Sequence, residues 1–264
     1  MTASRPSRNE PGAGGAPRCF IEAPDWAAAL LPLSEEESHH VLHVLRLREG
    51  DRVEVFDGEG GGARAEIALA TKRQVSVRPG PVRRAPPPAL RLGLVQALPK
   101  GAKSDFLLQK AVELGLSRVT LAEAQHSVVR LNAEELEARR GRWRRIAINA
   151  AKQCGRNRLP EILAAGSIEA AVRARAPGAL WVFGDFSPDA RPLRDVLREA
   201  AGRGAADIEA AVGPEGGFSP EEVACLRGAG AVPVNLGANV LRTETAALYL
   251  MCALAYELGA ESQQ

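Results

Sequence analysis

Residues 208–219 read IEAAVGPEGGFS, and this stretch decides the fold class of the chain. The apolar run Ile208–Val212 predicts a buried strand, and the glycines directly after it predict a tight turn. Ser219 then signals a helix start, because serine caps the first free amides and the proline after it suits the first helical position. A strand, a glycine loop and a capped helix in this order form the repeating unit of a parallel α/β sheet.

The same rhythm extends on both sides of this stretch. Further apolar strands are predicted at Leu90–Ala97, Arg118–Leu121, Ala179–Gly184 and Val232–Leu236. Helices are predicted at Ser104–Leu114, Ala133–Cys154, Pro192–Ala200, Pro220–Arg227 and Thr243–Leu258. Strands and helices in alternation predict a largely parallel sheet that is covered by helices on both faces.

The first third of the chain has a different pattern. A strand at Arg18–Ala23 and a short helix capped by Ser34 are followed by runs of alternating apolar residues. These runs lie at Arg52–Phe56, Ala63–Leu69 and Gln74–Val77, as is typical of a small β-rich domain. The prolines that follow suit neither a helix nor a sheet. We therefore predict a disordered tail over 1–17, a β-rich domain over 18–80, a linker over 81–88 and an α/β domain over 89–264.

Composition excludes several classes of protein. The chain has 264 residues, 45% hydrophobic and 25% charged, which is ordinary for a soluble globular protein. It has neither the apolar core of a signal peptide nor a run of about 18 apolar residues that could span a bilayer. The four cysteines are far apart and form no paired motif, so we expect reduced thiols in a cytoplasmic protein and no metal site. His39 and His43, one helical turn apart, are expected to be exposed or RNA-facing rather than bound to zinc.

Positive charge is concentrated in one segment, although the net charge is only +2. Arg139–Arg158 contains eight lysines and arginines and no acidic residue. Such density is an electrostatic footprint for phosphate, because each cation that neutralises a phosphate releases counterions. The alternative is a solvated basic helix face, which charge alone does not exclude.

Two loops are candidate ligand sites. Gly213–Ser219 follows a strand, where α/β folds bind small molecules, although glycines also occur in ordinary turns. The chain lacks the glycine motifs of phosphate-binding loops and of dinucleotide-binding folds, which argues against an NTPase or a dehydrogenase. The second loop, 236–246, reads LGANVLRTETA and runs into an apolar helix that Thr243 or Thr245 could cap. Arg242 is electrostatically misplaced at this positive helix end, which favours an anion or a polar ligand there.

These two loops carry a family resemblance. GPEGGFS followed about twenty residues later by a loop of the form LGxxxLRTETA resembles the paired motifs of the uridine N3-methyltransferases of small-subunit ribosomal RNA. The resemblance extends over residues 18–258. Its further matches are HVLHVLRLREG at 40–50, FDG at 56–58, Lys100-Gly101, QKAVELG at 109–115 and QCGRNRLP at 153–160.

The resemblance implies an N-terminal PUA-like β-barrel and a C-terminal parallel-sheet domain of the SPOUT class, whose chain forms a trefoil knot. It implies S-adenosylmethionine as methyl donor, a homodimer, and 16S ribosomal RNA in the small ribosomal subunit as partner, with no membrane or DNA partner. The residues implied to hold the cofactor are Phe183, Gly184, Gly213, Pro214, Glu215, Gly216, Gly217, Leu236, Gly237, Ala238, Asn239, Val240, Leu241, Thr243 and Ala246.

Methylation of uridine N3 requires loss of its proton and stabilisation of charge on the flanking carbonyl oxygens. We expect Arg242 to stabilise that charge, and Glu244 to orient Arg242 or to accept the proton. The residues expected to contact RNA are His40, Arg46, Arg48, Lys100, Lys110, Arg145, Arg156 and Arg158.

The chain departs from the family pattern at Gln125-His126, where relatives have an acidic residue and an arginine, and at Lys152, where relatives have glutamate. Two other functions remain open. One is a knotted methyltransferase with a different target, such as a transfer-RNA base or a ribose hydroxyl. The other is a non-catalytic RNA-binding factor in ribosome assembly.

Overall fold

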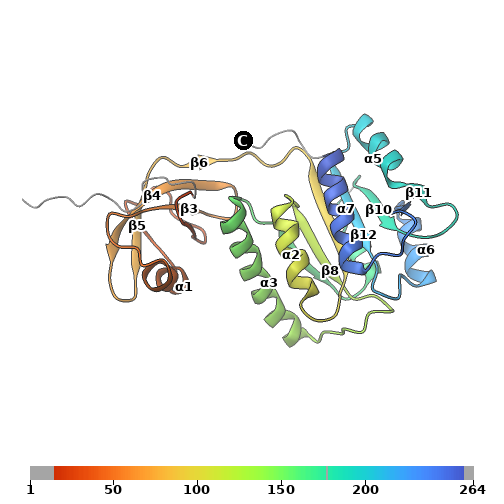
Figure 1. Cartoon of the computed structure of the whole chain (residues 1–264), viewed down its shortest axis with the longest axis horizontal. Helices are drawn as coiled ribbons and strands as arrows, with labels where there is room; N and C mark the ends of the chain where they lie inside the picture. The colour runs from red at the N-terminus through yellow and green to blue at the C-terminus, as the bar shows by residue number, and fades with distance from the viewer. Residues whose placement is uncertain (1–14, 177, 259–264) are drawn as a thin grey trace, which may run out of the picture. The chain divides into compact units, whose positions relative to one another are not determined.

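The computed structural model describes residues 15–176 and 178–258, so most of the tail predicted over 1–17 lies outside the described residues. The chain divides into two compact units (Figure 1). Unit 1 runs up to Pro87 and takes in Ala151–Leu159, whereas unit 2 comprises Pro88–Ala150 and the chain from Pro160 onward. In the part of the chain that is described, no helix is both long and apolar enough to cross a membrane.

Unit 1 is built on a six-stranded sheet in the order β1-β3-β4-β5-β2, with β6 paired to β4. The strands are β1 (Arg18–Phe20), β2 (Leu31–Pro32), β3 (Arg52–Phe56), β4 (Gly61–Ala70), β5 (Val75–Pro79) and β6 (Arg83–Arg84). β1 runs parallel to β3, and the other pairs are antiparallel. Alternate residues such as Val53, Val55 and Ile67 point into the core, which explains the alternating pattern in the sequence.

The helical segment of unit 1 changes its winding midway. Helix α1 (Glu35–His39) is capped by Ser34, whose side chain accepts a hydrogen bond from the amide of Glu37. The chain then continues as a single π-helical turn, η1 (His40–Val44). Arg46 follows with φ +56°, a left-handed conformation that is costly for a side chain with a Cβ. The sequence predicts one short α-helix here, and the wider turn is a feature that periodicity does not show.

A segment distant in sequence completes unit 1. The Lys152 ammonium lies 2.8 Å from both carboxylate oxygens of Glu37, and both side chains are largely buried. The amide of Gly60 donates to the carbonyl of Asn157, and the amide of Leu159 donates to that of Gly58. The sequence-based boundaries contain no such return, because residues 151–154 continue the helical pattern of Ala133–Cys154 and no local pattern links residues 155–159 to the first domain.

Unit 2 contains a seven-stranded parallel sheet in the order β11-β13-β10-β12-β7-β8-β9. Its strands are β7 (Arg91–Ala97), β8 (Arg118–Ala122), β9 (Glu161–Ala165), β10 (Leu180–Gly184), β11 (Arg191–Pro192), β12 (Asp207–Val212) and β13 (Val232–Asn235). The predicted parallel α/β class is therefore confirmed. The two edge strands, β9 and β11, are not predicted, because neither combines length with a clear apolar run.

Helices cover both faces of this sheet (Figure 1). They are α2 (Lys103–Glu113), α3 (Ala133–Cys154), α4 (Ile168–Arg173), α5 (Leu193–Gly202), α6 (Pro220–Gly228) and α7 (Thr243–Glu257). Leu94 joins the core formed with α2, α5 and α7, whereas its neighbour Val95 joins the core formed with α4 and α6. Burial on both faces makes these strands continuously apolar, as predicted. The short helix α4 is not predicted.

Candidate active site

Three neighbouring strands bring the predicted cofactor residues to one edge of the sheet. β13, β10 and β12 lie side by side, with Gly184 opposite Val234 and Phe183 opposite Ala211. Because the strands are parallel, the loops 185–190, 213–219 and 236–242 all leave from the same edge. Ligands of open α/β sheets bind at this carboxyl edge.

The glycines in and beside these loops are required either by close packing or by the backbone conformation. A Cβ added at Gly213 would lie 3.0 Å from the backbone nitrogen of Phe218, so the loop folds tightly back on itself. Gly217 has φ +72°, which favours glycine. A Cβ at Gly184 would lie 3.3 Å from Cδ1 of Leu236, so the ends of β10 and β13 are closely packed.

Thr243 joins three parts of the site. Its hydroxyl donates to the carbonyl of Gly213 at 2.7 Å and accepts from Nε2 of Gln96 at 2.8 Å. The amide oxygen of Gln96 is buried and receives no hydrogen bond from the described residues, so an acceptor remains open at this corner. The prediction that Thr243 or Thr245 caps α7 is wrong, because Arg242 is the N-cap residue and the hydroxyl of Thr243 points to the glycine loop.

Lys103 is a site residue that sequence reasoning missed. Its ammonium lies 2.9 Å from Oε1 of Glu215 and 2.9 Å from Oε2 of Glu244. As the first residue of α2 it adds positive charge to a positive helix end, and the two carboxylates offset that cost. Hydrogen bonds with Glu215 and then Glu244 raise the pKa of Lys103. No local spacing in the sequence indicates that Lys103 reaches two loops more than a hundred residues away.

The predicted catalytic pair lies at the start of α7. Burial acts to raise the pKa of Glu244, but the Lys103 ammonium, the backbone and the charge of Arg242 together hold it below its ordinary value. Glu244 is therefore a carboxylate at neutral pH. Arg242 is exposed, and its charge is close enough to act on Glu244.

Two of the residues that depart from the family pattern, Gln125 and His126, brace the glycine loop. Nδ1 of His126 lies 3.2 Å from the carbonyl oxygens of both Gly216 and Gly217. A proton on Nδ1 would let the ring donate to either carbonyl. The amide of Gln125 donates to Glu222 at 2.7 Å, and Glu222 also completes the capping box of Ser219. The backbone of this segment, as well as its side chains, thus fixes the loop.

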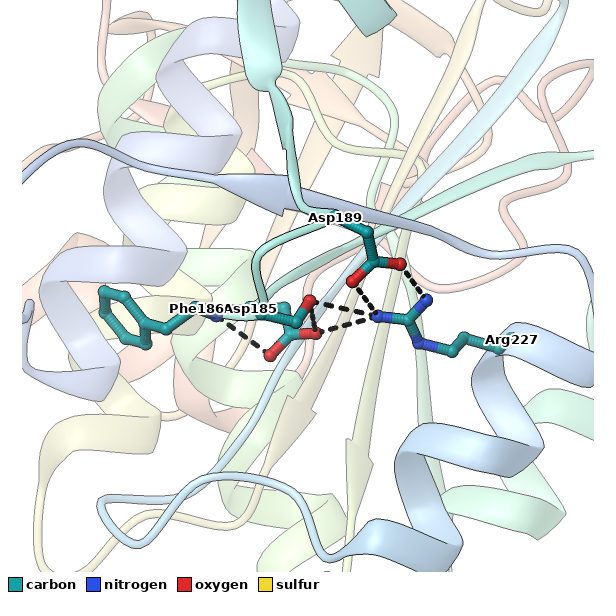
Figure 2. A network of polar contacts seen from close by, with 5 residues as sticks. Asp185, Phe186, Asp189 and Arg227 are labelled. Atoms are coloured by element: carbon teal, nitrogen blue, oxygen red, sulfur yellow. Dashed lines mark hydrogen bonds and ion pairs between the residues drawn. The ribbon is translucent and has the colours of Figure 1, made fainter.

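The loop after β10 is fixed from α6 (Figure 2). The guanidinium of Arg227 pairs with Asp189 and Asp185 and donates to the hydroxyl of Ser187 at 3.0 Å. Hydrogen bonds from Arg227 and then Ser187 hold the pKa of Asp189 well below its ordinary range. Phe186 points away from this network and is 63% exposed, so the loop presents an aromatic ring to its surroundings.

The predicted RNA-contacting residues fall in both units. In unit 1, His40 begins the π-helical turn, and Arg46 and Arg48 are exposed. Arg158 donates to the carbonyl of Ala85 and, with Arg84, lines an open hollow of about 570 Å³. Burial lowers the pKa of Arg156, so this guanidinium is only partly available to a ligand.

In unit 2, Lys100 and Arg145 are exposed, and Lys110 pairs with Glu113 as a surface pair of its own helix. The basic segment Arg139–Arg158 is partly neutralised, since Arg142 pairs with Asp105 in unit 2. Fewer basic side chains of this segment are therefore available to bind phosphate than its sequence suggests.

Comparison with known proteins identifies the family. A family model described as an RNA methyltransferase domain matches residues 86–255, and one described as an RNA methyltransferase PUA domain matches residues 33–80. The ribosomal RNA small subunit methyltransferase E of Mycobacterium bovis is 31% identical, over 89% of each chain. The protein of the same name from Bacillus subtilis is 29% identical, over 89% of this chain and 91% of its own.

Solved structures agree with these matches. A ribosomal RNA small subunit methyltransferase E from Neisseria gonorrhoeae, bound to S-adenosyl methionine, superposes with a TM-score of 0.80 at 28% identity, covering 91% of this chain and 97% of its own. A protein from Legionella pneumophila in complex with the cofactor SAM gives a TM-score of 0.82 at 31% identity, covering 92% of this chain and 98% of its own. The chain therefore belongs to the ribosomal RNA small subunit methyltransferase E family of RNA methyltransferases.

Proposed function

We propose that this enzyme transfers a methyl group from S-adenosylmethionine to N3 of a uridine in 16S ribosomal RNA of the small ribosomal subunit. The proposal rests on two features of unit 2 that lie together at the carboxyl edge of the parallel sheet. One is the glycine-lined cradle formed by 213–217 and 236–241, and the other is the charged cluster of Lys103, Glu244 and Arg242 beside it.

The residues present fit the cofactor. A Cβ at Gly217 or at Gly237 would meet nothing within 4 Å, so no described group crowds the backbone of the cradle at these two positions. The backbone of Gly213–Gly217 and of Leu236–Leu241, with the strand end at Phe183-Gly184, would hold the cofactor. When bound, S-adenosylmethionine supplies a methyl group on a positively charged sulfur. The trefoil knot implied by the resemblance is part of this proposal.

The chain's own residues would prepare the base. Glu244, ionised at neutral pH, accepts the N3 proton, and Arg242 stabilises the negative charge that develops on a flanking carbonyl oxygen. The network of Arg227 fixes the loop after β10, and His126 braces the glycine loop, so both loops are preorganised. The predicted RNA-contacting residues of both units would hold the phosphate backbone.

We also propose that the enzyme acts in the cytoplasm as a homodimer. Tyr249, Cys252 and Tyr256 form an exposed stripe along α7 at helical spacing, and Tyr256 is 87% exposed. A largely apolar helix with such a stripe is suited to pairing with a second copy. Light scattering measures the molar mass of wild type and of Tyr249→Glu. We expect a dimer for wild type and a weakened dimer for the variant, and a monomeric wild type would contradict the proposal.

The test of function uses small ribosomal subunits that lack their own uridine N3 methylation. They are incubated with the enzyme and labelled S-adenosylmethionine, and the modified nucleoside is identified by mass spectrometry. Labelled 3-methyluridine is the expected product. Another methylated nucleoside would replace the proposed target, and binding of the cofactor without transfer to any RNA would replace the catalytic role by an RNA-binding one.

A further inference from the structure

Lys103 and Glu244 form a donor and acceptor pair beside the cofactor cradle. The two charged groups are 2.9 Å apart, and the side chain of Lys103 is 32% exposed. Oε2 of Glu244 is buried from solvent, and apart from the ammonium of Lys103 the described residues give it no hydrogen-bond partner. The pair thus combines an ammonium that solvent reaches with a carboxylate whose hydrogen-bonding capacity is not filled.

This arrangement matches one edge of one kind of base. Uracil presents an N3–H donor directly beside the O4 carbonyl acceptor, so it needs an acceptor and a donor placed side by side. Cytosine presents the reverse pattern, because its N3 lacks a proton and its N4 amino group is a donor. With N3 held at the carboxylate for methyl transfer, cytosine would set an unprotonated N3 against Glu244 and its N4 amino group against the ammonium, and such mismatches of polar groups discriminate strongly.

We propose that Lys103 is a specificity-determining residue that reads the uracil edge, donating to O4 while Glu244 accepts the N3 proton. The proton moves from N3 to a carboxylate oxygen, and the nitrogen keeps the electron pair of the broken bond. The ammonium then lies next to the oxygen on which negative charge develops, where it favours loss of the proton. This inference rests on the proposed function and names how that site selects its base.

The surroundings of Lys103 suit this role. Glu215, from the glycine loop, anchors the ammonium from a second side, so Lys103 can turn toward a base without losing every partner. Lys100 acts on Glu215 rather than on Glu244. The groups that face Glu244 are Lys103 from α2 and Arg242 at the start of its own helix.

The experiment compares Lys103→Gln and Lys103→Arg with a control, Lys72→Gln, an exposed lysine outside the site and its proposed RNA contacts. Three quantities are measured: the affinity for S-adenosylmethionine, the affinity for short RNAs that carry uridine or cytidine at the target position, and kcat/KM against pH. We expect Lys103→Gln to reduce the preference for uridine about 10- to 100-fold, the size of one lost hydrogen bond to a charged group.

The pH profile separates this role from a merely structural one. Because Lys103 lowers the pKa of Glu244, its removal is expected to move the acidic limb of kcat/KM to higher pH, and Lys103→Arg is expected to restore part of the loss. Cofactor affinity should stay within about two-fold of wild type, since the ion pair that joins Lys103 to the glycine loop through Glu215 is partly exposed and contributes little. An unchanged uridine preference with an unchanged pH limb would overturn the proposal, as would a loss confined to cofactor binding. The RNA affinities test the inference even if wild-type enzyme transfers no methyl group.

Discussion

The hydroxyl of Thr243 donates a 2.7 Å hydrogen bond to the carbonyl of Gly213, which ties the first residue of α7 to the glycine loop after β12. The same oxygen accepts from Gln96 on β7, so one buried side chain connects three segments that meet at the site. A small polar side chain thus sets the distance between the two loops of the proposed cofactor cradle.

Replacing Thr243 by Val keeps the shape of the side chain and removes both hydrogen bonds. We expect a loss of about 1–3 kcal/mol in the free energy of unfolding, because the partly buried carbonyl of Gly213 and the buried amide of Gln96 each lose a partner. Affinity for S-adenosylmethionine should fall as well, as the loop loses its anchor. Denaturant unfolding and calorimetry measure the two effects. Thr245→Val, at an exposed position of the same helix, is the control, and an equal loss in both variants would contradict the prediction.

Arg242→Ala is expected to lower methyl transfer by about one to three orders of magnitude, the effect of removing one preorganised group that stabilises developing charge. The fold should be unaffected, because Arg242 is exposed and its side chain makes no capping hydrogen bond. Single-turnover kinetics at saturating cofactor measure the effect. Arg194→Ala, another exposed arginine of unit 2, should retain wild-type rates. Wild-type turnover in Arg242→Ala would remove it from the proposed mechanism.

The fold follows from the sequence where local signals are strong. The helix start predicted at Ser219 forms as a capping box, and Asn132 and Glu135 form another, because both rest on contacts between residues three apart. Most strands of unit 2 are recognisable because burial on both faces makes them largely apolar. The edge strand β9 escapes prediction because none of its residues is fully buried, and the helix α4 escapes it because six residues are too few to show a clear period.

The site follows from the sequence only in part. The loops at 213–217 and 236–241 are found by their glycines and their motif, and the parallel sheet then brings them to the same edge. Lys103 is missed because its partners come from distant loops, a relationship that no local pattern encodes. The same holds for Lys152 and Glu37, whose pairing joins the end of α3 to α1.

The ion pair of Lys152 and Glu37 makes a prediction about stability. Both side chains are largely buried, so Lys152→Met leaves a buried carboxylate without its cation and is expected to cost about 3–5 kcal/mol of unfolding free energy. The double variant Glu37→Gln, Lys152→Met removes both charges and should recover part of that loss. Denaturant unfolding of the three proteins forms the comparison. If the double variant were less stable than Lys152→Met alone, buried charge would not be the cause.

Glu209 predicts how stability depends on pH. It lies on β12 with only 6% exposure, and burial raises its pKa although Arg118 is 3.2 Å away. The folded protein therefore keeps this proton to a higher pH than the unfolded chain, whose value is near 4.5. Between the two values the folded state binds more protons, so this group's contribution to stability decreases as pH rises.

Glu209→Gln removes that contribution. The difference in unfolding free energy between wild type and Glu209→Gln should therefore change in one direction. As pH rises from about 4, near the ordinary pKa of glutamate, to about 7, wild type should lose stability relative to the variant. Unfolding in urea at a series of pH values measures it. Glu66→Gln, which changes an exposed carboxylate of unit 1 that pairs with the exposed Arg78, should give a nearly flat difference. A wild type that gains on Glu209→Gln with rising pH would mean that the attraction of Arg118 outweighs burial and that Glu209 is held as a carboxylate in the folded protein.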